Sequence, residues 1–149
     1  MVNTGDQYLK AIYLLAVRSD EPTATGAIAD QLDVSPASAT EMIGKLEERG
    51  FLSHEKYKGV TLTDAGIERA REALQTYCII ERFLHNVLEV EEFTAEAREL
   101  ESVIDDTVAG RLDTIIDRAD ECPDCFDVDT DACGLLRAGM RTEERQASD

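Results

Sequence analysis

The chain has 149 residues, 43% of them hydrophobic, which is enough for one folded unit with a real core or for two small subdomains. Its 32 acidic and 15 basic residues give a net charge of −17, an excess that by itself disfavours a nucleic-acid partner, because phosphate contacts need Lys and Arg. No apolar run approaches the ~20 residues that span a bilayer, and the N-terminus lacks the pattern of a secretory signal, so we expect a cytoplasmic protein.

The acidic residues are unevenly distributed. Residues 1–34 carry five acids and two bases (net −3), residues 35–62 carry four of each (net 0), and residues 63–149 carry 23 acids and nine bases (net −14). We therefore expect residues 35–62, which carry no net charge, to contact any partner that acidic residues would repel. The abundance of Asp and Glu is typical of proteins from halophiles, because in molar salt the Debye length falls to ~3 Å and like charges barely repel.

Apolar periodicity predicts three helices before residue 51. The first covers residues 6–20 and ends before Pro22. The second starts from an N-cap at Thr25 and is short. The third starts from an N-cap at Ser35, has Pro36 at its first position, and ends at Gly50. Two short helices joined by a tight turn at Asp33 are typical of a helix-turn-helix.

The next segment, "FLSHEKYKGVTLT" at residues 51–63, predicts two short strands around Lys58-Gly59, a hairpin with a basic tip. Three helices and such a hairpin together predict a winged helix-turn-helix. A long helix follows from an N-cap at Thr63, and residues 94–117 predict further helix. The apolar faces of these later helices are too wide for one small bundle to bury, which predicts a dimer. The positions expected to face inward are Ile67, Ala70, Leu74, Tyr77, Cys78, Ile80, Phe83, Leu84, Val87, Leu100, Val103, Ile104, Val108, Leu112, Ile115 and Ile116.

Three segments together, "YLKAIYLL", "IADQLDVSPASATEMIGKLEERGFLSHEKYKGVTLTDAG" and "ERFLHNVL", resemble the DtxR/MntR family of metal-dependent transcriptional regulators over residues 6–112. The resemblance implies a mainly α homodimer with a winged helix-turn-helix domain at 1–62, a helical dimerisation and metal-sensing domain at 63–140, and a polar tail at 141–149. The chain is similar to the short members without an SH3-like domain. We therefore predict a DNA-binding regulator, a repressor of iron or manganese homeostasis genes, and no enzyme.

The resemblance places the DNA-contacting residues within residues 35–62. Small polar and apolar side chains at the start of the third helix correspond to those that touch base edges and phosphates in the family. Basic residues later in this helix and in the wing suit the DNA backbone. The predicted DNA-binding residues are Ser35, Pro36, Ala37, Ser38, Thr40, Lys45, Arg49, Lys56, Tyr57 and Lys58. Ordinary helix capping is the other explanation for the hydroxyl residues.

The family's metal ligands correspond poorly to this chain. The family has an acid or Met before the tyrosine of the first helix, in some members a Glu three positions later, and then a Cys or Glu, a Glu and a His in a later helix. The corresponding residues here are Gln7, Lys10, Arg98, Glu101 and Ser102. Where the family has a His followed four residues later by Glu, this chain has Tyr77 and Glu81. Glu81 and Glu101 are the surviving candidate ligands, and Lys10 and Arg98 instead suit salt bridges with Glu101 and Glu99.

The remaining candidate ligands are thiolates. Cys78 lies on the same helical face as Glu81, and "ECPDCFDVDTDAC" at residues 121–133 contains the C-x-x-C pair Cys122 and Cys125, followed by Cys133. Four cysteines match the ligand count of a tetrahedral site and favour Zn(II) or Fe(II), whereas Mn(II) prefers oxygen and imidazole. The predicted cofactor is thus a transition-metal ion, Fe(II), Mn(II) or Zn(II). Three alternatives stay open: a dithiol redox sensor in which any metal is only structural, a structural Zn clip on a regulator that senses something else or nothing, and Cys78 as an ordinary core residue.

Overall fold

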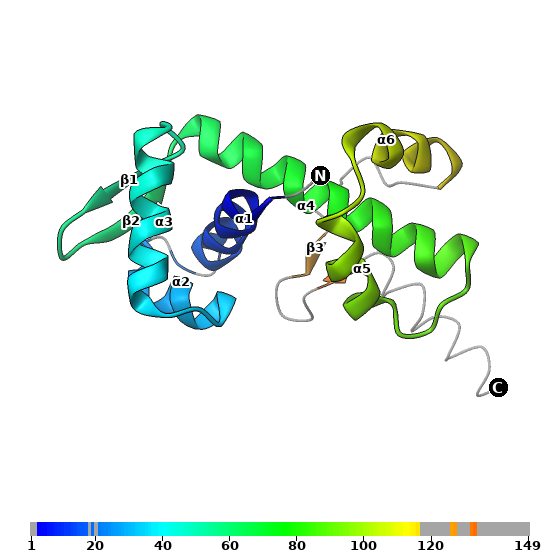
Figure 1. Ribbon diagram of the computed structural model, residues 1–149, viewed down its shortest axis with the longest axis horizontal. Coiled ribbons are helices and arrows are strands. Elements are labelled where there is room, and N and C mark those ends of the chain that lie inside the picture. The colour runs from blue at the N-terminus through cyan, green and yellow to red at the C-terminus, as the bar shows by residue number, and fades with distance from the viewer. Residues whose placement is uncertain (1–2, 18, 20, 117–125, 128–131, 134–149) are drawn as a thin grey trace. The chain divides into compact units, whose positions relative to one another are not determined.

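The computed structural model describes residues 3–17, 19, 21–116, 126–127 and 132–133 (Figure 1). Its elements are α1 (Thr4–Val17), α2 (Thr25–Leu32), α3 (Pro36–Glu48), β1 (Leu52–Glu55), β2 (Gly59–Leu62), α4 (Asp64–Arg82), the π-helical turn η1 (Phe83–Val87), α5 (Phe93–Glu101), α6 (Asp106–Ile115), β3 (Phe126–Asp127) and β4 (Ala132–Cys133). The predicted mainly α fold with an N-terminal winged helix-turn-helix is confirmed. None of the described helices is long and apolar enough to cross a membrane.

The described residues divide into two compact units, and the division lies inside α4 between Ala73 and Leu74. The first unit holds α1 to β2 and the first part of α4. The second holds the rest of α4 and the elements that follow it. The predicted domain limits at 62/63 and 140/141 remain a prediction, and the units are described separately.

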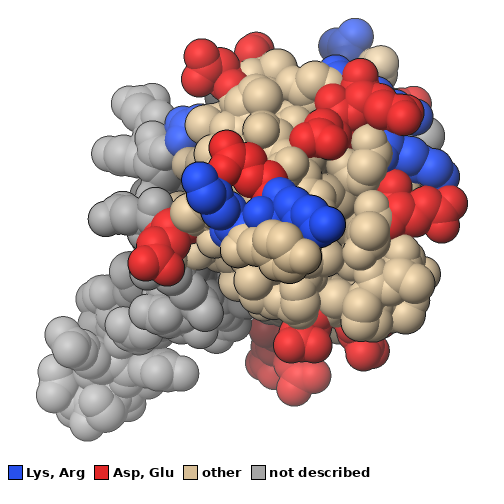
Figure 2. Space-filling model, turned by 90° about the vertical axis from the view of Figure 1, so that its left-hand side faces the viewer, with Lys and Arg blue, Asp and Glu red and all other residues tan. Residues whose placement is uncertain are grey.

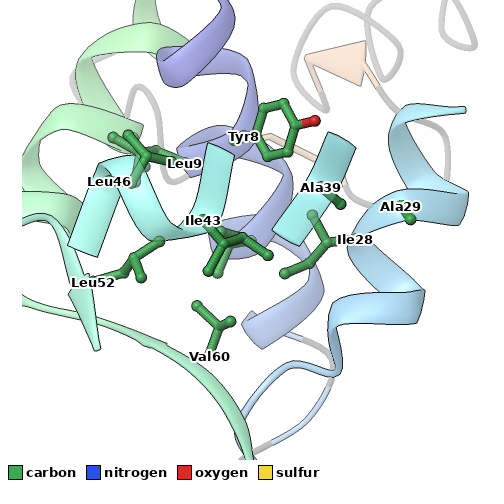
Figure 3. Packing of buried hydrophobic residues seen from close by; sticks show 11 residues of the cluster. Tyr8, Leu9, Ile28, Ala29, Ala39, Ile43, Leu46, Leu52 and Val60 are labelled. Carbon is green, nitrogen blue, oxygen red and sulfur yellow. The ribbon is translucent and has the colours of Figure 1, made fainter. Parts of the chain in front are cut away.

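The first unit is built around α3. This helix has one buried face, formed by Ala39, Ile43 and Leu46 at the spacing of successive helical turns. The face packs against Leu9 and Ile12 of α1, together with Ile28 of α2 and Val60 of β2 (Figure 3). Ile43 is fully buried in the centre of this cluster, so α3 is held between two helices and the hairpin.

The ends of α2 and α3 follow from local chemistry. Ser35 caps α3 as predicted, with its side chain accepting a hydrogen bond from the Ser38 N–H, and Pro36 occupies the first turn. Asp33 makes the turn between the helices with a φ of 54°. The prediction of Thr25 as an N-cap was wrong: Ala24 holds that position without a side-chain hydrogen bond, and Thr25 is already helical.

The wing is an antiparallel hairpin in which Leu52 pairs with Leu62 and Glu55 with Gly59. Its turn lies at Lys56–Lys58, one step before the predicted Lys58-Gly59, and Tyr57 adopts a φ of 70° there. The start of β2, next to the turn, also pairs with the segment before α2, because Thr23 and Val60 exchange both backbone hydrogen bonds, at 2.9 and 2.8 Å. Gly59 (φ 111°) allows this close approach, since a Cβ there would meet the Thr23 carbonyl oxygen at 2.7 Å.

In the second unit, residues of α4 and η1 form a core with α5. The core contains Tyr77, Cys78, Ile80 and Leu84 from the first two elements, and Phe93 and Ala97 from α5. The further helix predicted at 94–117 is present as two helices: α5 ends at Glu101, and α6 begins after Asp105, whose side chain accepts a hydrogen bond from the Val108 N–H at 2.9 Å. The Asp105 side chain thus gives the Val108 N–H the acceptor that a backbone carbonyl would supply in a continuous helix.

Several residues predicted to face inward are exposed in the single chain. They are Ile67 (38%), Val87 (45%), Val103 (68%), Val108 (45%) and Ile115 (61%). The helical pattern predicted that these five side chains are buried, but in one copy of the chain they are exposed. Four of the five belong to the second unit, which is the part expected to dimerise.

A test of the first unit uses Gly66 in the first turn of α4, because a Cβ at this position would clash with the Phe51 carbonyl oxygen. Gly66→Ala should lower the free energy of unfolding by about 1–3 kcal/mol, the usual cost of overpacking. The measurement is urea unfolding followed by circular dichroism. Gly26→Ala is the matched control, since Gly26 in α2 has open space around it and Ala there should be neutral or stabilising. Equal effects of both changes would contradict this packing.

Candidate functional site

The N-terminal end of α3 presents small side chains to solvent. Ser35, Pro36, Ala37, Ser38 and Thr40 are all exposed. The Ser35 hydroxyl donates a hydrogen bond to the Ser38 hydroxyl (2.9 Å), and the Thr40 hydroxyl donates to the Pro36 carbonyl (2.9 Å). The first-turn N–H groups and the positive end of the helix dipole lie at the same place. This end can therefore approach a negatively charged surface closely, without long side chains in between.

The basic side chains of α3 and the wing are exposed. Lys45 forms an ion pair with Glu41 at 3.6 Å, and Lys58 forms one with Glu55 at 3.4 Å. Exposed pairs of this kind contribute about 0–1 kcal/mol, so a phosphate can replace the carboxylate at little cost. Arg49, at the C-cap of α3, is also exposed.

The wing tip carries an exposed aromatic ring. Tyr57 is 94% exposed, and the Lys56 ammonium lies 5.2 Å from the centre of its ring. A cation held over an aromatic face is favourable by about 0.5–1 kcal/mol at an exposed site. The pair forms a basic projection beyond the paired part of the hairpin.

Seen from the side of α3 and the wing, the surface has basic and acidic groups interspersed with uncharged ones (Figure 2). This appearance agrees with the equal number of acids and bases in residues 35–62. The face is electrically mixed, in contrast to the strong net negative charge of the whole chain.

One contact that fixes this face was not predicted from the sequence. The Glu47 carboxylate accepts a hydrogen bond from the backbone N–H of His54 at 2.7 Å, which joins α3 to β1. The Thr63 hydroxyl adds a second link by donating to the Gly50 carbonyl at 2.7 Å. Both contacts depend on how the chain turns after α3, and no residue pattern indicates them in advance.

A second group of functional candidates lies between α4 and α5. Glu81 is fully buried and Glu101 is 2% exposed, so two carboxyl groups lie within the packed second unit. Tyr77, one helical turn before Glu81, is 2% exposed. Arg98 lies one turn before Glu101 on α5 and is exposed.

The Tyr77 hydroxyl is influenced by all of these groups. Burial raises the pKa of Tyr77 far above its ordinary value, and the neighbouring Glu81 carboxylate raises it further. The charge of Arg98 acts in the opposite direction, and the charge of Glu101 adds a smaller rise. The two acids, the phenol and the guanidinium therefore form one cluster, which we name the α4–α5 cluster.

Two sequence profiles match the chain in succession. The profile of "Iron dependent repressor, N-terminal DNA binding domain" matches residues 1–60, and that of "Iron dependent repressor, metal binding and dimerisation domain" matches residues 63–126. The chain belongs to the iron-dependent repressor family. The predicted DtxR/MntR membership, DNA partner, homodimer and transition-metal cofactor are thereby confirmed for this family member; the predicted halophilic source and the individual site residues remain predictions.

Relatives and solved structures agree with this assignment. The chain is 35% identical over 120 residues to an uncharacterised HTH-type transcriptional regulator of Methanocaldococcus jannaschii, a match that covers 79% of this chain and 96% of the relative. It is 34% identical over 82 residues to the transcriptional regulator MntR of Lysinibacillus sphaericus, covering 55% of this chain and 58% of MntR. The structure of ScaR with bound Zn²⁺ has a TM-score of 0.70 and 31% identity, covering 85% of this chain and 59% of ScaR. The chain thus spans somewhat more than half of these last two proteins.

The α4–α5 cluster of this repressor does not by itself fit the metal that the family implies. A first-row transition ion in such a site takes four to six donors, such as carboxylate, imidazole or thiolate. The cluster offers two carboxylates, a phenol and a cation, and no group of three or more His, Cys, Asp or Glu side chains suited to a metal occurs among the described residues. The charge of Arg98 acts on the same hydroxyl as the two acids, and a positive charge at this place repels a divalent ion.

Of the predicted cysteine ligands, Cys78 is the one whose side chain lies in the part of the chain that the structure describes. Cys78 is fully buried in the core of the second unit, among Ile80 and Leu84, as an ordinary core residue would be. Cys122 and Cys125 lie outside the described residues. Cys133 belongs to β4, where its backbone pairs with that of Phe126. A metal site at Cys122, Cys125 and Cys133 stays a prediction.

Burial of Tyr77 predicts a loss of stability at alkaline pH. In the unfolded chain the phenol ionises near pH 10.0, whereas the folded state holds its proton to higher pH. The unfolded state therefore releases a proton that the folded state keeps, and the free energy of unfolding falls as pH rises above about 10. The free energy of unfolding of the wild type minus that of Tyr77→Phe, measured by urea unfolding in EDTA, should therefore fall between pH 9 and pH 11.

The control for this measurement is Tyr57→Phe, at the exposed tyrosine of the wing. A Tyr77→Phe difference that stays constant up to pH 11 would contradict the buried position of the Tyr77 hydroxyl.

Proposed function

We propose that the chain acts in the cytoplasm as a homodimeric repressor of metal-ion homeostasis genes and is no enzyme. The observation that carries this proposal is the exposed end of α3, with its small side chains and the positive end of its helix dipole, in the same unit as a basic wing. Such a helix end enters a major groove without steric conflict, and its first residues meet base edges there. A transition-metal ion is the effector, in keeping with the Zn²⁺-bound and manganese-bound states in which ScaR and a related repressor were solved.

Ser35, Pro36, Ala37, Ser38 and Thr40 would contact base edges and the nearest phosphates. The basic residues Lys45, Arg49, Lys56 and Lys58, with Tyr57, would contact the backbone. In molar salt these basic contacts gain little from counterion release, so base contacts and DNA shape supply the specificity. The thiol redox sensor remains the second candidate, but no contact among the described residues favours it.

Ser38→Asp combined with Thr40→Asp should abolish binding to operator DNA, because two carboxylates would face the phosphates and base edges. We expect a loss of at least 100-fold, equivalent to about 2.7 kcal/mol. The measurement is fluorescence anisotropy with promoter DNA that the wild type selects from its own genome, in molar KCl with Mn(II), Fe(II) or Zn(II). Thr4→Asp with Ala65→Asp is the control, since it adds the same charge at exposed sites of the first unit. Unaltered binding by the Ser38 and Thr40 variant would overturn the proposed docking.

The exposed apolar residues of the second unit are proposed to lie in the dimer interface. Ile115→Arg should therefore convert the dimer to a monomer, because a charge would replace a side chain buried by the partner copy. The mass is measured by sedimentation at micromolar concentration. Val17→Arg, at an exposed valine of the first unit, should leave the dimer intact. A stable Ile115→Arg dimer would place the interface elsewhere.

A further inference from the structure

The α4–α5 cluster has an unusual charge requirement. Glu81 and Glu101 are 0% and 2% exposed, and two buried carboxylates close to one hydroxyl repel one another unless a cation lies nearby. Removing a carboxylate from water costs several kcal/mol, so an ionised pair of this kind is retained only with compensation. The cluster needs either protons or a positive charge.

Arg98 is a cation placed to meet this requirement. It precedes Glu101 by three residues on α5, a spacing that puts both side chains on one helical face. Its charge acts on the Tyr77 hydroxyl, the same atom on which the charges of Glu81 and Glu101 act. Arg82 follows Glu81 directly, and neighbouring residues on a helix do not face each other.

A guanidinium is well suited to replace a bound ion in such a place. It remains charged at every physiological pH, and its planar fork donates to carboxylate oxygens from more than one nitrogen. It also excludes a divalent cation, because the two positive charges would share the same acids. The replacement of an imidazole donor by the Tyr77 phenol acts in the same direction, since a neutral phenol is a poor metal ligand.

We infer that Arg98 is a built-in counter-cation for Glu81 and Glu101, so that the α4–α5 cluster forms without a metal ion and does not bind one. This inference rests on the proposed function in one respect, that the chain responds to a transition metal. The response then depends on ligands other than this pair of acids. Arg98 is a positioning residue in the cluster, and it needs no contact with DNA or with the effector.

The first test measures Mn(II) binding, because Mn(II) prefers oxygen and imidazole donors and avoids thiolate sites. The full chain, metal-stripped and reduced, is titrated with Mn(II) in molar KCl, with the free ion followed by electron paramagnetic resonance. Glu101→Gln should leave the wild-type isotherm unchanged. The double variant Tyr77→His with Arg98→Glu restores an imidazole and a third carboxylate and should bind one additional Mn(II) per chain, at least tenfold more tightly than any wild-type site.

The matched control is Tyr77→His with Arg111→Glu, which makes the same change in composition but places the acid at an exposed position of α6. It should gain no Mn(II) site. A wild-type Mn(II) site that Glu101→Gln weakens tenfold or more would overturn the inference.

The second test measures folding in EDTA and needs no metal. Arg98→Ala should lower the thermal midpoint by at least about 3 °C, because the buried acids lose their counter-cation. Adding Glu101→Gln to this variant should recover most of the loss, whereas Arg111→Ala should have little effect. A midpoint unchanged by Arg98→Ala, or no recovery by Glu101→Gln, would contradict the inference.

The two proposals fail in different ways. If the wild type binds no promoter DNA with any metal, the proposed function is wrong, whereas the Mn(II) isotherms and thermal midpoints still decide the role of Arg98. If Glu101→Gln abolishes Mn(II) binding while DNA binding persists, the role assigned to Arg98 is wrong and the regulator is a conventional member of its family.

Discussion

The packing of α3 against α1 and the wing is the interaction on which the proposed DNA-binding face depends. Ile43 and Leu46 fill the space between these elements, and Glu47 and Thr63 fix the chain immediately after the helix. The exposed end of α3 needs only small side chains because its position is set from the opposite, buried face. The exposed end of α3 therefore provides the proposed DNA contacts, and its buried face stabilises the fold.

The second unit contains two buried acidic residues, unlike the proposed DNA-binding face, whose charged side chains are exposed. Most of the chain's excess acid belongs to residues 63–149, where it can be solvated, but Glu81 and Glu101 are withdrawn from water. Such acids are costly, and in a metal-binding family they point to an ion-binding role. In this chain the α4–α5 cluster also contains Arg98 and Tyr77, at positions where family members have metal ligands. A chain can therefore retain the helical scaffold and the acids of its family while changing what neutralises them.

The accuracy of the sequence predictions depended on how local each signal was. Ser35, Pro36 and the turn at Asp33 were predictable because a cap and a tight turn are decided within a few residues. The end of α5 was missed because apolar spacing continues across residues 102–105, and one Asp105 side chain interrupts the helix. The cluster around Tyr77 required the packing of α5 on α4, which periodicity does not describe. The burial of Val103 and Ile115 was predicted incorrectly for one chain, because the pattern does not distinguish a core from an interface.

The hydrogen bonds between Thr23 and Val60 have a consequence for how this protein can change over evolution. They tie β2, just after the turn of the wing, to the segment before α2, while Lys56, Tyr57 and Lys58 project beyond the paired strands. Mutations at these three tip residues therefore have little folding cost, whereas mutations at Gly59, which directly follows them, are strongly constrained. Duplicated copies of such a gene can therefore diverge in how tightly they hold the DNA backbone through changes at the tip alone, while the base contacts of α3 and the scaffold stay the same.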